Sequence, residues 1–240
     1  MILYGRNPVR EALRGLRASA IGAVWATGGA AREPWLEGVA VRTAAAEEIE
    51  RRCGSPAHQG ICAEAGPYPY ADPEQLLAAE RPLILALDQI QDPQNLGSIC
   101  RTAECVGASG VVIPERRAAE ITAAVCKASA GAVEHLRVAR VRNVADFLVR
   151  ARESGCWSYG ASAASASPER PPVPYGAPDY AGSGVVLVLG SEGSGLRPRV
   201  AGACDQLVAL PLLGRVESLG VSAAAAALLY EILQQRGGGG

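Results

Sequence analysis

The sequence has almost no lysine and no long apolar run, and both absences exclude classes of protein. Lys127 is the only lysine among 23 basic residues, and 24 carboxylates give a net charge of −1. This charge argues against nucleic-acid binding by bulk charge alone. The longest wholly apolar run, Ala223 to Leu229, is far shorter than the ~20 residues that span a bilayer. Residues 1–13 also lack the apolar core of a signal peptide, so we expect no membrane partner.

The cysteines form no C-x-x-C pair, which predicts neither a zinc site nor a disulfide framework. There are seven of them: Cys53, Cys62, Cys100, Cys105, Cys126, Cys156 and Cys204. We therefore expect reduced thiols, no metal and a cytoplasmic location. The other 22 basic residues are arginines. Arginine favours bidentate contacts to phosphate, although a general bias toward Ala, Gly and Arg explains their number equally well.

Residues 1–66 are predicted to form a small α/β domain with eight arginines against seven carboxylates. Asn7 and Pro8 are typical of the cap and first residue of a helix. Its apolar face would hold Val9, Ala12, Leu13 and Leu16. Arginines fall on the opposite face or just before the helix: Arg6, Arg10, Arg14 and Arg17. This basic stripe fits either a solvated surface or a phosphate-binding one. Short apolar runs lie at 21–26 and 38–41, a closing strand is expected at 61–63, and a second helix over about 44–52.

Prolines mark a boundary after this domain. Residues 67–73 contain three of them, which cannot continue a helix or a central strand. We therefore predict a linker over 67–80 and a second domain over 81–240. There, strands (83–87, 111–113, 136–141, 157–161, 185–189, 207–210) alternate with helices (96–106, 118–129, 144–153, 221–235). Such alternation implies an α/β fold with a parallel sheet flanked by helices. Residues 163–184, rich in Ser, Ala and Pro, are expected to form an exposed loop.

Three segments place polar residues where such a sheet binds its ligands, at the carboxyl ends of strands. The first follows the strand that ends near Asp88; Asn95 is expected to cap the next helix, and Arg101 lies about two turns into it. The second, VVLVLGSEGSGL over 185–196, is a buried strand that leads Glu192 into a glycine loop. The third is a strand, a glycine loop and a helix over 210–222. Each alone is equally compatible with ordinary turn and cap chemistry. A nicotinamide enzyme is disfavoured because the first strand–helix junction lacks phosphate-binding glycines.

Together, the segments DPQNLGSICRTAECVGASG, LVLGSEGSGL and LPLLGRVESLGVSAAAAALLYE resemble, in this order, the three motifs of the SpoU family of RNA ribose 2′-O-methyltransferases. The resemblance covers residue 83 to the C-terminus. The stretches YGRNPVREAL and AHQGI resemble the small RNA-binding domain, similar to certain ribosomal proteins, of members that modify large-subunit ribosomal RNA. One position departs from the pattern: the third motif of the family is S-L-N-V-S, and Gly220 replaces its asparagine.

The resemblance implies a C-terminal sheet with a deep trefoil knot, a small N-terminal α/β ribosomal-protein-like domain, and a homodimer with its sites near the interface. The knot would form the pocket for S-adenosylmethionine, the methyl donor. By the same resemblance, the cofactor would contact Gly190, Leu210 and Leu219. The catalytic and substrate residues would be Asn95, Arg101, Glu192 and Ser218, some of them donated across the dimer. The RNA would meet the basic stripe, at Arg6, Arg10 and Arg14.

The chemistry of methyl transfer to a ribose hydroxyl distinguishes the roles of these side chains. Arginine stays protonated in proteins, so we expect Arg101 to hold the ribose or phosphate and to stabilise developing alkoxide charge. Glu192 is the better proton acceptor, or else it orients Asn95 or Arg101. His58 and His135 are weaker candidates for substrate contact. Two alternatives stay open: a non-catalytic RNA-binding factor of the same fold, because of Gly220, and a transfer RNA 2′-O-methyltransferase.

Overall fold

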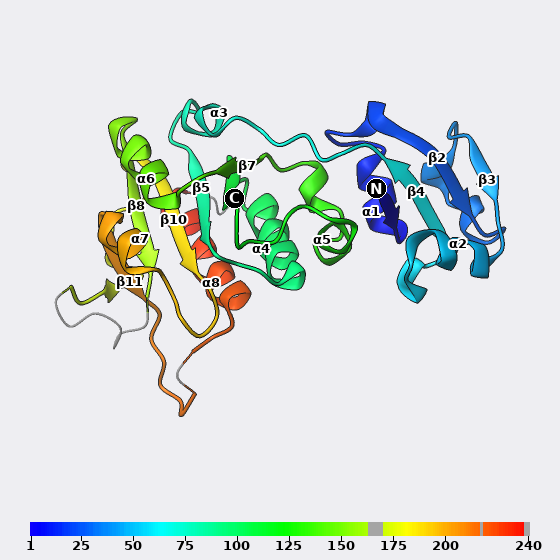
Figure 1. Ribbon diagram of the computed structural model, residues 1–240. Coiled ribbons are helices and arrows are strands. Elements are labelled where there is room, and N and C mark those ends of the chain that lie inside the picture. Colours follow the sequence, from blue (N-terminus) through cyan, green and yellow to red (C-terminus); the bar gives the residue numbers. More distant parts are fainter. Residues whose placement is uncertain (163–169, 217, 238–240) are drawn as a thin grey trace. The chain divides into compact units, whose positions relative to one another are not determined.

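The computed structural model describes residues 1–162, 170–216 and 218–237 of the chain. Two compact units are present (Figure 1): unit 1 comprises residues 1–69 and 120–135, and unit 2 comprises residues 70–119 and 136–240. Among the described residues, no helix has both the length and the apolar character that a membrane crossing requires. All seven cysteines are free. The cytoplasmic location stays a prediction.

Unit 1 is built on a four-stranded sheet in the order β1-β4-β2-β3. The strands are β1 (Ile2–Tyr4), β2 (Ile21–Ala26), β3 (Val41–Thr43) and β4 (Ile61–Ala65). Strand β4 runs antiparallel to β1 and β2, and β3 is parallel to β2. The helices are α1 (Arg6–Ala12), α2 (Ala46–Cys53) and α5 (Ala123–Ala128). Unit 1 therefore corresponds to the small α/β domain expected from the sequence, and it contains one additional helix, α5.

Helix α1 begins and ends earlier than predicted. Gly5, with a φ of 94°, holds the position before the helix, so Asn7 is not its cap. Because α1 ends at Ala12, Leu16 falls outside the apolar face and is 47% exposed. Because α1 ends before residue 17, Arg17 does not lie on the predicted basic face of the helix; it is buried, with 1% of its surface exposed.

Residues 120–135, which the sequence assigned to the second domain, pack within unit 1. The physical reason is a buried ion pair: Arg17 Nε donates to Glu134 Oε2 at 3.0 Å, and both side chains are essentially inaccessible to solvent. Helix α5 starts at Ala123, later than expected, because the Thr122 hydroxyl accepts the Val125 N–H and caps it. Burial raises the pKa of the Cys126 thiol, next to this pair, to about 12.

Unit 2 contains a seven-stranded sheet in the order β7-β6-β5-β10-β8-β11-β9, and every pairing is parallel. The strands are β5 (Leu83–Asp88), β6 (Gly110–Pro114), β7 (Val138–Val141), β8 (Cys156–Ala161), β9 (Val173–Pro174), β10 (Gly184–Gly190) and β11 (Gln206–Ala209). The predicted α/β fold with a parallel sheet is confirmed. The two central strands, β5 and β10, are buried along almost their whole length.

Helices cover both faces of this sheet (Figure 1). They are α3 (Pro73–Leu77), α4 (Pro93–Cys105), α6 (Val144–Glu153), α7 (Pro198–Ala203) and α8 (Val221–Gln235). Helix α4 packs against α8 and α6 against α7. Helix α8 has the predicted bounds, because its apolar residues recur at helical spacing. On the α6 side, Phe147, Leu148 and Val200 pack with Val186 and Val188 of β10 in one apolar core.

Two segments expected to be irregular contain structure. The 67–80 stretch includes helix α3, capped by the Asp72 carboxylate, and Ala71 forms a bridge to Ala139 of β7. In the loop expected over 163–184, residues 163–169 lie outside the described residues. Further along, Val173–Pro174 forms strand β9, which pairs with β11. Helix α7 was not predicted either, because it spans only six residues.

Candidate functional site

A cavity of about 320 Å³ opens at the carboxyl ends of β5 and β10. Its lining comes from the β5–α4 junction, the loop after β10 and the start of α8: Gln89, Ile90, Gln91, Asp92, Asn95, Ser191, Glu192, Ser194 and Val221. The volume is that of a small-molecule site. The lining is mostly polar, with the carboxylates of Asp92 and Glu192 in it. Two of the predicted site residues, Asn95 and Glu192, thus meet in one cavity.

The β5–α4 junction carries Asn95 into the cavity because another residue caps the helix. Asp92 Oδ1 accepts the N–H of Gln94 at 2.9 Å, and Pro93 starts the helix. The prediction that Asn95 caps α4 is therefore wrong. Asn95 therefore lies in the first turn of α4 without a capping role, and it lines the cavity.

The loop after β10 is a tight glycine turn. A Cβ on Gly190 would lie 2.2 Å from the carbonyl carbon of Gly195, so only glycine fits there. Gly193 and Gly195 have φ values of 84° and 65°, which other residues rarely adopt. Within this turn the hydroxyl oxygens of Ser191 and Ser194 lie 2.6 Å apart. The three glycines singled out in the sequence are thus required by the backbone.

The turn also fixes Glu192 against the last helix. Glu192 Oε1 accepts the N–H of Val221, the first residue of α8, at 3.3 Å. Gly220, which precedes α8, offers no side chain to cap it. A Cβ on Gly220 would lie 3.3 Å from the same carboxylate oxygen. The position of the missing family asparagine therefore borders Glu192 directly.

A residue pair that sequence reasoning missed anchors this turn to the sheet. Asp88, at the end of β5, is fully buried and accepts hydrogen bonds from Arg197. Its Oδ1 receives the Arg197 side chain through Nε at 2.8 Å and Nη2 at 2.7 Å, and its Oδ2 receives the backbone N–H at 2.9 Å. The only sequence signal was a carboxylate at the end of a buried strand.

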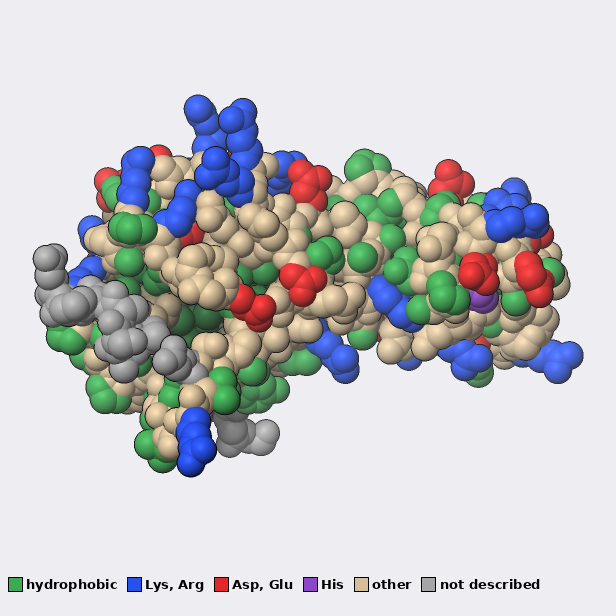
Figure 2. All heavy atoms as spheres, turned by 60° about the horizontal axis from the view of Figure 1, so that its bottom comes forward, with side chains coloured by type: hydrophobic (Ala, Val, Ile, Leu, Met, Phe, Trp, Pro, Cys, Tyr) green, Lys and Arg blue, Asp and Glu red, His purple; other side chains and the backbone are tan. Residues whose placement is uncertain are grey.

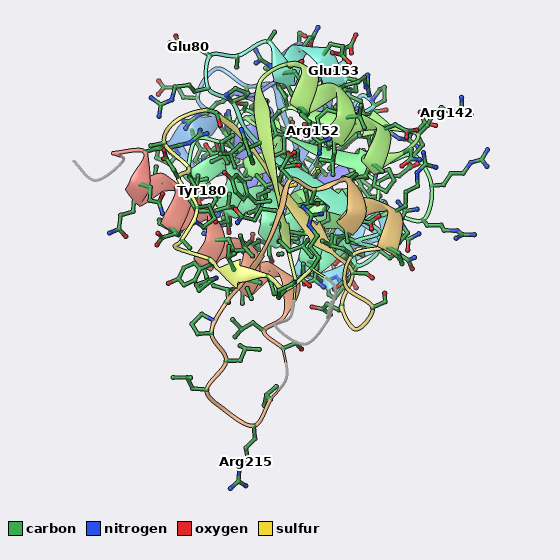
Figure 3. The ribbon with its side chains drawn as sticks, turned by 90° about the vertical axis from the view of Figure 1, so that its left-hand side faces the viewer. Glu80, Arg142, Arg152, Glu153, Tyr180 and Arg215 are labelled. Atoms are coloured by element: carbon green, nitrogen blue, oxygen red, sulfur yellow. The ribbon has the colours of Figure 1, made fainter. Side chains whose placement is uncertain are left out.

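The remaining predicted site residues do not line the cavity. Arg101 is exposed on α4, Ser218 is exposed, and Leu219 is 46% exposed. Leu210 is half-buried after β11. Residues 211–216 extend away from the rest of unit 2, with Arg215 at their tip (Figure 3).

On unit 1, the three arginines predicted to bind RNA are accessible, but two have carboxylate partners. Arg6 pairs with Glu33 at 2.8 Å and Arg10 with Glu11 at 2.7 Å, and Arg14 is exposed. The guanidinium-bearing side chains of Arg6 and Arg10 stay 51% and 39% exposed, although their carboxylate partners are half-buried.

The two histidines have structural partners within unit 1. His58 is buried, and its Nδ1 accepts the N–H of Gly60 at 2.9 Å. His135 Nε2 lies 2.9 Å from a carboxylate oxygen of Glu11. Partial burial disfavours ionised Glu11, but hydrogen bonds from His135 and Arg10 outweigh it and hold the pKa of this carboxyl below its usual value.

An open parallel sheet with a polar cavity beyond the carboxyl ends of its central strands defines a ligand-binding α/β protein. The family model described as the SpoU rRNA Methylase family matches residues 82–230. A second model, described as RNA 2′-O ribose methyltransferase substrate binding, matches residues 2–71. The chain therefore belongs to the SpoU rRNA methylase family, which confirms the resemblance.

Relatives with similar sequences cover most of the chain. The putative TrmH family tRNA/rRNA methyltransferase YacO of Bacillus subtilis (strain 168) is 44% identical over 185 residues, which cover 75% of this chain and 71% of that protein. A putative TrmH family tRNA/rRNA methyltransferase of Staphylococcus haemolyticus (strain JCSC1435) is 33% identical over 250 residues, covering 98% and 96%.

A solved structure agrees with the fold. The crystal structure of an AdoMet-bound rRNA methyltransferase from Sinorhizobium meliloti has a TM-score of 0.80 and 25% identity, covering 97% of this chain and 86% of that one. The protein is thus a SpoU-type RNA methyltransferase, a class that uses S-adenosylmethionine.

Proposed function

We propose that the protein transfers a methyl group from S-adenosylmethionine to a ribose 2′-hydroxyl of RNA, in large-subunit ribosomal RNA. The observation that carries this proposal is the meeting of Asn95, Glu192 and a glycine turn around one cavity. A substrate-binding match over residues 2–71, a separate part of the chain, supports a large RNA substrate.

The residues present fit a cationic, nucleoside-containing cofactor. At Gly190 the backbone passes close to that of Gly195, and without a side chain there the main-chain groups of the turn can face a ligand. The carboxylates of Asp92 and Glu192 attract a positive sulfonium. When bound, S-adenosylmethionine supplies an electrophilic methyl group. Gly190, Leu210 and Leu219 would hold it, largely through backbone groups. For Leu219 to reach a cofactor in the cavity, the residues around it would have to lie closer to the cavity, because Leu219 is 46% exposed here.

Within the cavity, Glu192 would accept the proton that leaves the ribose hydroxyl, directly or through a water molecule. Its hydrogen bond with Val221 uses one carboxylate oxygen and fixes the orientation of the other. Asn95 would donate from its amide to the ribose, and Ser218 would contribute a hydroxyl. Arg101 would stabilise the developing alkoxide.

Arg101 and the 211–220 segment both favour a homodimer as the working form. Arg101 is exposed on α4 and does not line the described cavity, so we propose that it completes the site of a second copy. Apolar side chains are exposed along the segment: Leu212 (40%), Leu213 (99%), Val216 (74%) and Leu219 (46%). Such a run is typical of a protein interface. We further propose that α8 threads the turn over 190–197 as a trefoil knot, in line with the Glu192–Val221 hydrogen bond.

The test is methyl transfer in solution with isotope-labelled S-adenosylmethionine and three RNAs: large-subunit ribosomal RNA, small-subunit ribosomal RNA and total transfer RNA, from cells that lack the gene. We expect label in the large-subunit RNA. The modified linkage should resist alkaline hydrolysis, because a 2′-O-methyl group blocks the attack of the neighbouring hydroxyl. Label in transfer RNA instead would establish the alternative substrate. Cofactor and RNA binding without transfer would establish the non-catalytic alternative.

Arg101 variants test the dimeric site. Arg101→Lys should fail as Arg101→Ala does, since a point charge cannot reproduce the planar guanidinium fork. Mixing Arg101→Ala chains with Glu192→Gln chains should restore activity in mixed dimers, because one of their two sites is then intact. The absence of restoration in demonstrated mixed dimers would place Arg101 outside the partner's site.

A further inference from the structure

Three arginines emerge together at the carboxyl edge of the sheet in unit 2. Strands β6 and β7 pair in parallel through Pro114 and Val141, and Glu115 N–H donates to Val141 O at 2.9 Å. Arg116 and Arg117 therefore follow the end of β6 beside Arg142, which follows β7. We call Arg116, Arg117 and Arg142 the arginine edge. All three are exposed, and Figure 3 shows Arg142 directed away from the unit.

The arginine edge carries unneutralised charge. Three other exposed arginines of unit 2 have carboxylate partners: Arg150 pairs with Glu74, Arg152 with Asp205 and Arg199 with Asp146. Within the part of the chain that the structure describes, Arg116, Arg117 and Arg142 form no such pair. The acidic residues of the same stretch are Glu115 and Glu120, so three arginines against two carboxylates keep the local balance positive in a chain whose net charge is −1. Figure 2 shows basic side chains gathered at one margin of unit 2.

The same loop is fixed to the rim of the cavity. Ala119 N–H donates to the carbonyl of Ile90, a lining residue, at 2.8 Å. At its other end Arg140 Nη2 donates to Glu115 O at 3.1 Å. Between these anchors Arg117 has a φ of 59°, a conformation that costs a non-glycine residue on the order of 1 kcal/mol. The guanidinium groups of Arg116 and Arg117 therefore project from a loop held at both ends, next to the proposed reaction site.

We propose that the arginine edge binds backbone phosphates of the RNA strand whose target nucleotide occupies the cavity. Guanidinium groups match phosphate geometry, and a nucleotide held at Asn95 and Glu192 carries its strand past the adjoining rim. The inference rests on the proposed RNA substrate. It adds a second RNA-binding surface, on the methyltransferase unit itself, to the one expected on unit 1.

The test compares the triple variant Arg116→Gln/Arg117→Gln/Arg142→Gln with the control Arg81→Gln. Arg81 is also exposed and also has a positive φ, 49°, but it precedes β5 and so lies at the opposite edge of the sheet. The probes are transcripts of large-subunit ribosomal RNA, with Kd measured at several salt concentrations. Because lost phosphate contacts reduce the salt dependence by about one unit of slope each, we expect a slope lower by about two to three and binding at least about tenfold weaker at low salt.

Further readouts distinguish this surface from the catalytic site. The triple variant should keep the affinity for S-adenosylmethionine and the kcat of the unaltered protein and raise KM for RNA, whereas Arg81→Gln should change none of these. Melting curves check that the variants are folded; if the triple variant is not, Arg116→Gln and Arg142→Gln are measured singly. If the triple variant shows an unchanged Kd and an unchanged salt slope, the arginine edge does not bind RNA phosphates, and the proposed function is unaffected. An unaltered protein that binds neither ribosomal nor transfer RNA would overturn both.

Discussion

Arg197 and Asp88 are 109 positions apart in the sequence and form one ion pair that joins the turn carrying Glu192 to the end of β5. Asp88 is fully buried, while the Arg197 side chain is 43% exposed. A buried carboxylate is tolerated only when it is paired and hydrogen-bonded. The charged contact therefore ties the residue that follows the turn, Arg197 at the start of α7, to the end of β5, and it helps to fix the position of the turn.

Arg197→Ala should loosen this turn. The buried Asp88 carboxylate would keep the backbone N–H of residue 197 but lose the guanidinium, at a cost of about 1–3 kcal/mol in the free energy of unfolding. The affinity for S-adenosylmethionine should fall as well, because Ser191, Glu192 and Ser194 move with the turn. Urea unfolding and calorimetric titration measure the two effects. The control is Arg199→Ala, which breaks an ion pair with Asp146. The Arg199 and Asp146 side chains are 72% and 62% exposed, so this variant should cost less than about 1 kcal/mol. Equal effects of the two variants would contradict the anchoring role.

Gly190→Ala should abolish cofactor binding. The added methyl group would lie 2.2 Å from backbone atoms of Gly195, and backbone cannot rotate aside as a side chain can, so the turn must open. Titration with S-adenosylmethionine measures the loss. Gly202→Ala is the matched control: a Cβ at Gly202 meets nothing within 4 Å, and alanine in a helix is favoured over glycine by about 0.5–1 kcal/mol. Retained affinity in Gly190→Ala would remove this turn from the cofactor site.

Gly220→Asn restores the residue typical of the family and should raise kcat. The new side chain would begin 3.3 Å from Glu192 Oε1, the flexible end of a side chain that can shift slightly. A preorganised amide donor contributes as much as ~10²–10³ in rate where it stabilises developing charge. The unaltered chain should still show measurable transfer, because Asn95 and Glu192 stay together in the cavity. Gly214→Asn, at a position with open space around it, controls for a general effect of asparagine. Lower kcat in Gly220→Asn would show that another group fills this place.

Local patterns were sufficient to predict much of this molecule. The buried strand over 185–189 and the helix over 221–235 were found because apolar spacing depends on neighbours along the chain. Long-range pairs leave no such pattern: Arg17 could not be distinguished from Arg14 by its spacing, yet one is buried and the other exposed. Asn95 was mistaken for a cap because Asp92, three residues earlier, is an equally good cap. The resemblance to a family supplied the candidate site, and of its residues the structure brings Asn95 and Glu192 together in one cavity.

Breaking the buried pair of Arg17 and Glu134 should be among the most destabilising single changes in unit 1. Arg17 also donates to the Gly66 carbonyl at 3.2 Å and to Cys126 Sγ at 3.4 Å, so its charge is fully enclosed by partners. Glu134→Ala leaves that guanidinium buried without its counter-ion, and we expect a loss of about 3–5 kcal/mol in the free energy of unfolding.

Glu48→Ala is the control for this loss. It breaks an exposed pair with Arg52 one helical turn away and should cost about 0.3–0.5 kcal/mol. Urea denaturation followed by circular dichroism measures both variants. The double variant Arg17→Met/Glu134→Leu should recover most of the loss, since it leaves no unpaired buried charge. Because residues 120–135 pack with residues 1–69 in unit 1, deleting residues 1–66 should leave the buried Glu134 unpaired and destabilise the remaining chain rather than release an intact domain. A deletion variant as stable as the full chain, or a Glu134→Ala variant no less stable than Glu48→Ala, would contradict this account of how residues 120–135 are held.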